Sequence, residues 1–164
     1  MSELILRQAR PGDGAGLARI WIDGATHYAS LAPDAFQIPR AEGLAEWLEQ
    51  EALCTETYSH VAVLDDELVG HVWAAVLPPS AQAAWQMLRD LCRTRLTIHW
   101  LGVLRAHRRQ GIGTRLMVAA ESWGRSRGAE VAGFSTYVAG PLSVPFYEHG
   151  MGYQRQGLYF TKRL

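Results

Sequence analysis

The sequence lacks several features that would assign it to a specialised class of protein. Its 164 residues contain two cysteines, Cys54 and Cys92, which are too far apart to form a Cys-x-x-Cys motif. No disulfide framework or zinc site is indicated, and we expect both thiols to be reduced and buried. The six histidines have neither His-x-x-x-His nor His-Glu-x-x-His spacing, so no metal site is predicted.

An excess of one charge and long apolar runs are also missing. Sixteen basic and sixteen acidic residues give a net charge of zero, which does not indicate a nucleic-acid or anionic-membrane binder. No apolar run approaches the roughly eighteen residues that a membrane span needs. Met1-Ser2-Glu3 shows no basic start of a signal peptide. We therefore expect a cytoplasmic protein that binds neither nucleic acid nor membrane.

The features that are present predict one domain over residues 1–164, with an α/β fold. Apolar residues make up 48% and charged residues 20% of the chain, which is typical of globular proteins. Alternating apolar runs bounded by turn residues predict strands at 4–7, 60–64, 68–76, 96–104, 131–138 and 158–161. Helical spacing predicts helices after Asp13, over 41–53, after Ser80, after Gly113 and over 142–149. This order favours one mixed sheet covered by helices.

The most informative segment joins the strand at 96–104 to the following helix. It reads Arg108-Arg109-Gln110-Gly111-Ile112-Gly113. A helix start leaves backbone N–H groups unpaired and carries partial positive charge, while glycines let a ligand approach the backbone closely. With two arginines added, the turn suits a pyrophosphate, although glycine spacing alone fits an ordinary turn beside a solvated basic patch equally well.

This segment resembles the acyl-CoA-binding motif R/Q-x-x-G-x-G/A of the GCN5-related N-acetyltransferase (GNAT) superfamily. Arg108, Gly111 and Gly113 occupy its defining positions, and Phe146-Tyr147-Glu148 is similar to the family's last-helix motif. The resemblance spans essentially the whole chain. It implies a largely antiparallel mixed sheet of about six or seven strands, with helices on both faces and the fourth and fifth strands splayed apart.

The resemblance also implies a cofactor site for acetyl-CoA. The pantetheine arm would pair with the backbone of Leu101 and Val103, between the splayed strands. The pyrophosphate would lie on the turn itself. The cofactor-binding residues implied there are Arg108, Arg109, Gln110, Gly111, Ile112, Gly113 and Thr114.

Two side chains are candidates for proton transfer. Tyr147 matches the family's proton donor to the departing thiolate, and a core aromatic is the alternative. His99 matches a histidine position in arylalkylamine-type members and is a candidate base, since an imidazole accepts protons near neutral pH. Strand alternation predicts that His99 shares a face with Thr97, Leu101 and Val103. The alternative is a hydrogen-bonded sheet histidine, with water carrying the proton away.

Departures from the family pattern lie before Tyr147 and between the third and fourth strands. Gly140-Pro141 replaces the usual asparagine, and Pro145 predicts that the helix begins near Ser143. The segment 80–95 is longer than usual and is a candidate cover for the acceptor site or a candidate homodimer contact. In the family the first helices and the fourth strand border the acceptor pocket, so the resemblance makes Tyr28, Trp73 and Trp100 candidate substrate-binding residues.

The expected function is transfer of an acetyl group from acetyl-CoA to a primary amine of a small molecule, by direct attack in a ternary complex. Two alternatives stay open. One is acetylation of a protein N-terminus or lysine, and the other is a non-catalytic acyl-CoA-binding or regulatory domain. The identity of the amine is not predictable, because acceptor recognition is built from variable loops.

Overall fold

The computed structural model describes residues 3–162, so positions 1–2 and 163–164 of the predicted domain lie outside the described residues. The chain divides into two compact units, one ending at Phe134 and the other beginning at Ser135. The first unit contains all the sheet and three helices, and the second contains a short helical segment. No helix among the described residues has the length and apolar character required to cross a membrane.

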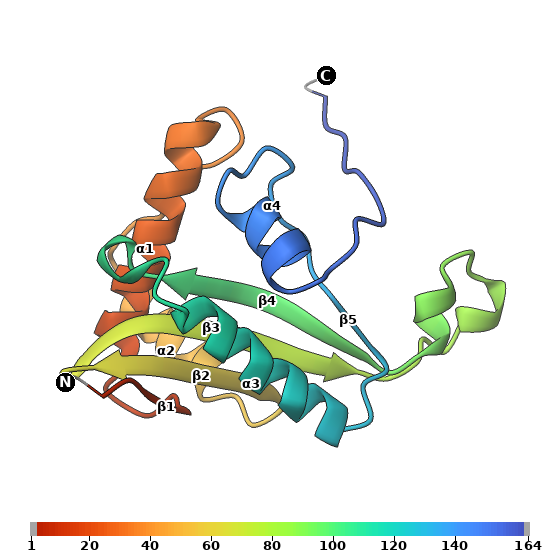
Figure 1. Cartoon of the computed structure of the whole chain (residues 1–164), viewed down its shortest axis with the longest axis horizontal. Coiled ribbons are helices and arrows are strands. Elements are labelled where there is room, and N and C mark those ends of the chain that lie inside the picture. Colours follow the sequence, from red (N-terminus) through yellow and green to blue (C-terminus); the bar gives the residue numbers. More distant parts are fainter. Residues whose placement is uncertain (1–2, 163–164) are drawn as a thin grey trace. The chain divides into compact units, whose positions relative to one another are not determined.

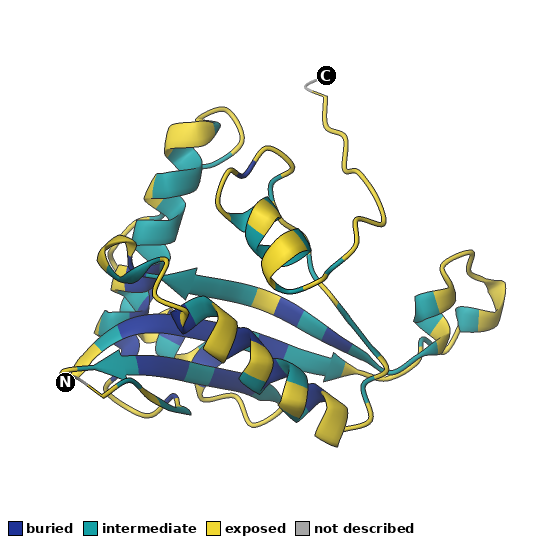
Figure 2. Cartoon of the chain, viewed as in Figure 1, coloured by how far each residue is buried: buried dark blue, intermediate teal, exposed yellow. Residues whose placement is uncertain are grey.

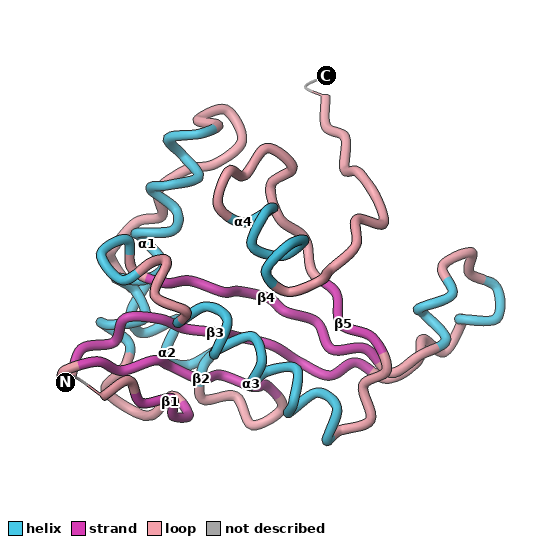
Figure 3. Tube along the Cα trace, in the orientation of Figure 1, coloured by secondary structure: helices cyan, strands magenta, loops and turns pink. Residues whose placement is uncertain are grey.

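The first unit is organised by a five-stranded sheet in the order β1-β2-β3-β4-β5 (Figures 1 and 3). The first four strands are antiparallel neighbours, and β5 lies parallel to β4. The strands are β1 (Ile5–Gln8), β2 (Thr57–Leu64), β3 (Glu67–Leu77), β4 (Arg95–Val103) and β5 (Val131–Gly133). The predicted mixed, mainly antiparallel sheet is confirmed, with fewer strands than the six or seven expected.

Helices cover both faces of this sheet, as predicted. α1 (Gly14–Leu31) and α2 (Leu44–Ala52) lie on one face, and α3 (Ile112–Ser126) lies on the other (Figure 1). Buried residues gather on the central strands and on the inward sides of the helices (Figure 2). The buried side of α3 includes Leu116, Met117 and Ala120.

The helix predicted after Ser80 is wrong. The segment that follows Ser80 instead contains two 3-10 turns, Ala83–Trp85 and Arg89–Cys92. The Trp85 side chain is 81% exposed, so the apolar residues at helical spacing have no face to pack on. A short helix without tertiary packing is marginal in water, which explains the outcome.

The prediction of a last strand over 158–161 is also wrong, and so is the prediction that the two thiols are buried. Residues 158–161 are irregular, and Leu158, Tyr159 and Phe160 are exposed. A sequence with high strand propensity forms a strand only where a partner edge and a packing face exist. Cys54 and Cys92 are free but exposed, because one lies in the turn after α2 and the other in a 3-10 turn.

The second unit contains the predicted last helix in an irregular form. α4 (Ser143–Pro145) begins at Ser143, as the position of Pro145 predicts, and a π-helical turn follows over Phe146–Gly150. The predicted regular helix over 142–149 is therefore replaced by two short pieces. Tyr147 lies in the π-helical turn.

Candidate acyl-CoA site

The turn between β4 and α3 has the backbone shape that its glycines predict. Gly111 is the N-cap of α3 and has a φ of 79°, and Arg109 has a φ of 65°. A Cβ on Gly111 would meet nothing within 4 Å, so the need for glycine comes from the backbone angle and not from crowding. Non-glycine residues rarely adopt a positive φ, so the backbone of Arg109 is strained. Such strain persists only where the surrounding structure holds the turn in place.

This turn opens α3 without a side-chain cap. The first turn of a helix therefore presents the N–H groups of Ile112, Gly113 and Thr114 without intrahelical acceptors, together with the positive end of the helix dipole. Gly113 is half-buried and Thr114 is exposed, while the Ile112 side chain is buried and fixes the helix start in the core. The arrangement can bind an anion through backbone groups.

The two arginines of the turn have different surroundings. Arg108 donates from Nε to the carbonyl of Val103 at 2.9 Å and forms an ion pair through Nη2 with Asp23 of α1. Arg109 is exposed, as is Gln110, whose amide makes a long 3.4 Å contact with the Ala106 carbonyl. Arg109 is thus the arginine that is accessible to an anion on the turn, and Arg108 has two donor groups engaged within the protein.

β4 has the partly unpaired edge that the splayed-strand prediction requires. It pairs with β5 only over Arg95 to Thr97, opposite Val131 to Gly133. Beyond Thr97, no strand in residues 3–162 pairs with this edge, which includes Leu101 and Val103 (Figure 3). Peptide groups on this edge can hydrogen-bond an extended ligand, except the Val103 carbonyl if that oxygen keeps its bond from Arg108 Nε.

A β-bulge in β4 overturns the predicted alternation of its side chains. Trp100 pairs with Trp73 and Ile98 with Ala74, so His99 is the extra residue opposite β3. Leu96 faces α3, since a Cβ on Gly124 would lie 3.0 Å from it. Gly102, six residues later, faces Ile20 of α1, although regular alternation would put these two positions on one face. His99 therefore does not continue a regular row with Leu101 and Val103.

The bulge gathers three predicted residues on the α1 face. The Trp100 ring centroid lies 4.3 Å from that of Trp21 of α1. Trp73 shares this face because it is the register partner of Trp100. His99 is exposed, and its ring centroid lies 5.0 Å from that of Trp73. The imidazole of His99 and the indoles of Trp73 and Trp100 therefore form one group, which we call the bulge cluster.

Both indole Nε1 atoms of the bulge cluster are buried, and no acceptor for them lies within the described part of the chain. A buried donor without a partner is unfavourable. Tyr28, the third predicted acceptor residue, belongs to a different contact set near the end of α1. Its ring centroid lies 5.1 Å from that of Phe36 and 5.6 Å from that of His27.

Tyr147 belongs to the second unit. Its ring packs against Phe146 at 5.0 Å between centroids and against Tyr153 at 6.1 Å. Its carbonyl accepts a hydrogen bond from the Tyr153 backbone N–H at 2.9 Å. These contacts hold Tyr147 in the π-helical turn.

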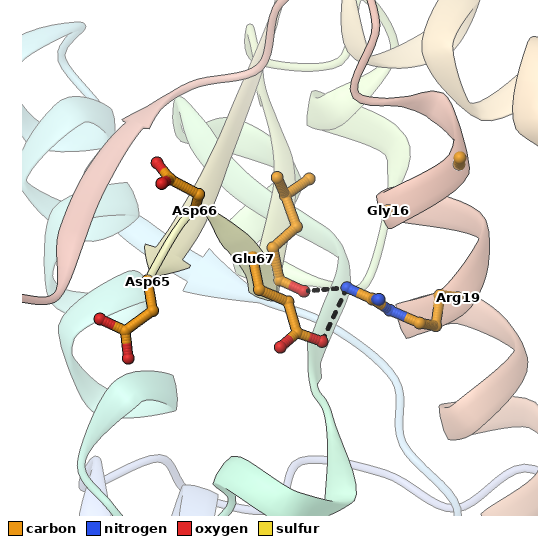
Figure 4. Close-up of a pocket in the computed structure, with 7 residues that line it drawn as sticks. Gly16, Arg19, Asp65, Asp66 and Glu67 are labelled. Carbon is orange, nitrogen blue, oxygen red and sulfur yellow. Dashed lines mark hydrogen bonds and ion pairs between the residues drawn. The ribbon is translucent and has the colours of Figure 1, made fainter. Parts of the chain in front are cut away.

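A surface hollow elsewhere in the first unit contains none of the predicted site residues (Figure 4). It lies between the start of α1 and the β2–β3 turn. Arg19 donates from Nη2 to the Leu68 carbonyl at 3.0 Å and pairs with Glu67 at 3.1 Å. Figure 4 shows Asp65 and Asp66 directed away from this pair. The basic group of this hollow is therefore engaged within the protein.

The sequence matches the model of the acetyltransferase (GNAT) family over residues 17–153. The chain belongs to the GNAT family. The match includes the turn at 108–114, the bulge cluster and Tyr147. No curated protein matches the sequence.

Solved structures share the GNAT fold at low identity. A mutant form of a Bacillus halodurans protein has a TM-score of 0.85 at 18% identity, covering 98% of this chain and 99% of that one. An aminoglycoside N-acetyltransferase in complex with CoA has a TM-score of 0.66 at 17% identity, covering 100% and 97%. An aminoglycoside 6'-N-acetyltransferase from Acinetobacter haemolyticus has a TM-score of 0.65 at 15% identity, covering 98% and 99%.

Sequence reasoning missed two features of this GNAT site. Asp23 has no motif around it, and its pairing with Arg108 spans 85 positions of sequence. The bulge at His99 left a weak signal in Trp100 and Gly102, because a large ring beside a glycine on one strand indicates close packing with a neighbour. A Cβ on Gly24 of α1 would lie only 2.6 Å from the Trp100 ring, which is the other half of that contact.

Proposed function

We propose that this GNAT protein transfers the acetyl group of acetyl-CoA to a primary amine of a small molecule. One observation carries the proposal: the uncapped start of α3, with Gly111 at positive φ, follows directly on a β4 edge that is unpaired beyond Thr97. The helix start suits a pyrophosphate, and the edge suits an extended arm with amide groups. Acetyl-CoA has both parts in this order.

The reaction that we propose is a direct transfer. The amine nitrogen attacks the thioester carbonyl carbon, the carbon–sulfur bond breaks, and CoA leaves as its thiolate. The proton released by the amine passes to His99, and Tyr147 donates a proton to the thiolate sulfur. Holding both reactants in one ternary complex supplies much of the rate, because their encounter becomes intramolecular.

The bulge cluster supports His99 as the base and Trp73 and Trp100 as acceptor-site residues. An exposed imidazole beside an indole gives a proton acceptor next to an apolar wall. Tyr28, near the end of α1, is proposed as a further acceptor contact. The two solved structures of similar fold are aminoglycoside N-acetyltransferases, which supports a small-molecule acceptor here.

A turnover screen tests this proposal. Purified protein with acetyl-CoA is offered aminoglycosides, alkylamines, arylalkylamines, and peptides with a free N-terminus or lysine, and release of the CoA thiol is followed. We expect amine-dependent release with at least one small amine, and intersecting lines when both substrates are varied. Turnover of peptides alone would overturn the acceptor class, and parallel lines would overturn direct transfer. Failure to bind CoA at all would overturn the proposal as a whole.

A further inference from the structure

Arg108 connects three segments of the first unit at one point. Its Nε donates to the Val103 carbonyl at the end of β4, and its Nη2 pairs with the Asp23 carboxylate of α1. Its backbone belongs to the turn that precedes α3. The guanidinium therefore fixes the start of the phosphate turn to a strand end and to a helix on the opposite face of the sheet.

The ion pair is sheltered enough to fix geometry. The side chains of Arg108 and Asp23 are 22% and 26% exposed, respectively. Charge-assisted hydrogen bonds in such surroundings are directional and stronger than neutral ones. Exposed surface pairs, by contrast, contribute little, and Arg19–Glu67 is one, with side chains 50% and 45% exposed.

The α1 segment around Asp23 is itself tightly placed against β4. Trp21 packs on the Trp100 ring, and Gly24 approaches that ring so closely that a Cβ there would collide with it. The carboxylate of Asp23 is thus presented to Arg108 from a helix that has little freedom to shift.

We propose that Asp23 is a positioning residue for coenzyme A: it holds Arg108 so that the 109–114 turn keeps the shape that receives the pyrophosphate. This inference rests on the proposed function. Arg108 then acts on the turn rather than as the main phosphate contact, and Arg109 is left as the accessible cation. If Arg108 instead contacted the phosphate directly, Asp23 would compete with the ligand for the guanidinium. Asp23→Asn should then tighten CoA binding rather than weaken it.

The test measures the affinity of CoA itself by titration calorimetry, so no acceptor amine is needed. Asp23→Asn should weaken CoA binding roughly tenfold, the order expected when one charge-assisted hydrogen bond no longer holds the turn. Asp23→Glu should restore part of the affinity. Glu67→Gln, which removes the exposed pair between α1 and the sheet, should leave it unchanged. Melting temperatures of all variants establish that they are folded at the assay temperature.

A double-mutant cycle separates positioning from general weakening. Arg108→Lys should weaken CoA binding to a similar extent, and the double variant with Asp23→Asn should be no weaker than either single variant. Additive losses, unchanged affinity or tighter binding in Asp23→Asn would overturn the inference. Failure of the wild-type protein to bind CoA would instead overturn the proposed function.

Discussion

At the scale of single residues, His99 is the candidate whose surroundings changed most between sequence and structure. The bulge moves it out of a regular row with Leu101 and Val103 and next to Trp73. As a general base, it must be neutral to accept the proton of the amine. Loss of this ring should therefore slow the step in which the amine gives up its proton.

Two substitutions at His99 test this role. His99→Ala and His99→Gln should each lower turnover by about 10²-fold. His99→Gln is the matched variant, because glutamine keeps hydrogen-bonding capacity but does not titrate. Turnover near the wild-type value in both variants would mean that water or another group accepts the proton.

Tyr147 carries a separate residue-scale prediction. Tyr147→Phe should lower turnover by about 10²-fold while CoA affinity stays near the wild-type value, because the hydroxyl is needed only when the thiolate departs. Tyr153→Phe is the control, since its ring adjoins that of Tyr147 and it keeps the same backbone hydrogen bond. Equal turnover in both variants and the wild type would make Tyr147 a packing residue.

At the scale of elements, the sequence was most informative where local chemistry decides the structure. The turn at 108–114 and the start of α4 at Ser143 follow from glycine and proline, and both form as predicted. Elements that depend on a distant partner were not predictable in this way. The apolar residues of 80–92 find no packing face, and 158–161 finds no partner strand.

The candidate site shows the same division between local and distant causes. The shape of the turn at 108–114 follows from residues adjacent in sequence: Gly111 has a positive φ, whereas Gly113 lies within α3 without one. The Asp23–Arg108 pair and the bulge arise from packing of α1 on β4, and neither has a local signal in the sequence strong enough to predict it. The single-domain organisation over 1–164 and the homodimer contact stay predictions.

At the scale of the whole molecule, a buried histidine links the stability of the first unit to pH. His71 of β3 is buried, and its Nε2 lies 2.9 Å from the Ser59 hydroxyl oxygen of β2. Burial lowers the pKa of His71 from 6.5 to about 4, against the opposing charge of Asp13 and with a smaller lowering by His60. The unfolded chain therefore binds a proton in this pH range that the folded chain does not.

The free energy of unfolding should therefore depend on pH. The contribution of His71 is fully present above pH 6.5 and is lost as pH falls from 6.5 to about 4, a loss on the order of 3 kcal/mol. His71→Gln should flatten this part of the profile, whatever its stability at neutral pH. Urea unfolding at several pH values measures both profiles, and parallel profiles would contradict the assignment.

The central claim is that the uncapped start of α3 receives the pyrophosphate of acetyl-CoA. Gly111 and Gly128 form a matched pair for testing it. Both have φ near +80°, neither has atoms within 4 Å of an added Cβ, and they lie at opposite ends of α3. An added carboxylate should be similarly strained at each site, and the helix dipole favours it at Gly111 rather than at Gly128.

Calorimetric titration of CoA into Gly111→Asp and Gly128→Asp is the most direct measurement. Gly111→Asp should weaken binding at least about a hundredfold, because a fixed negative charge then lies where the pyrophosphate must sit. Gly128→Asp should bind CoA like the wild type, even if it is less stable. A folded Gly111→Asp protein with wild-type affinity for CoA would contradict the account.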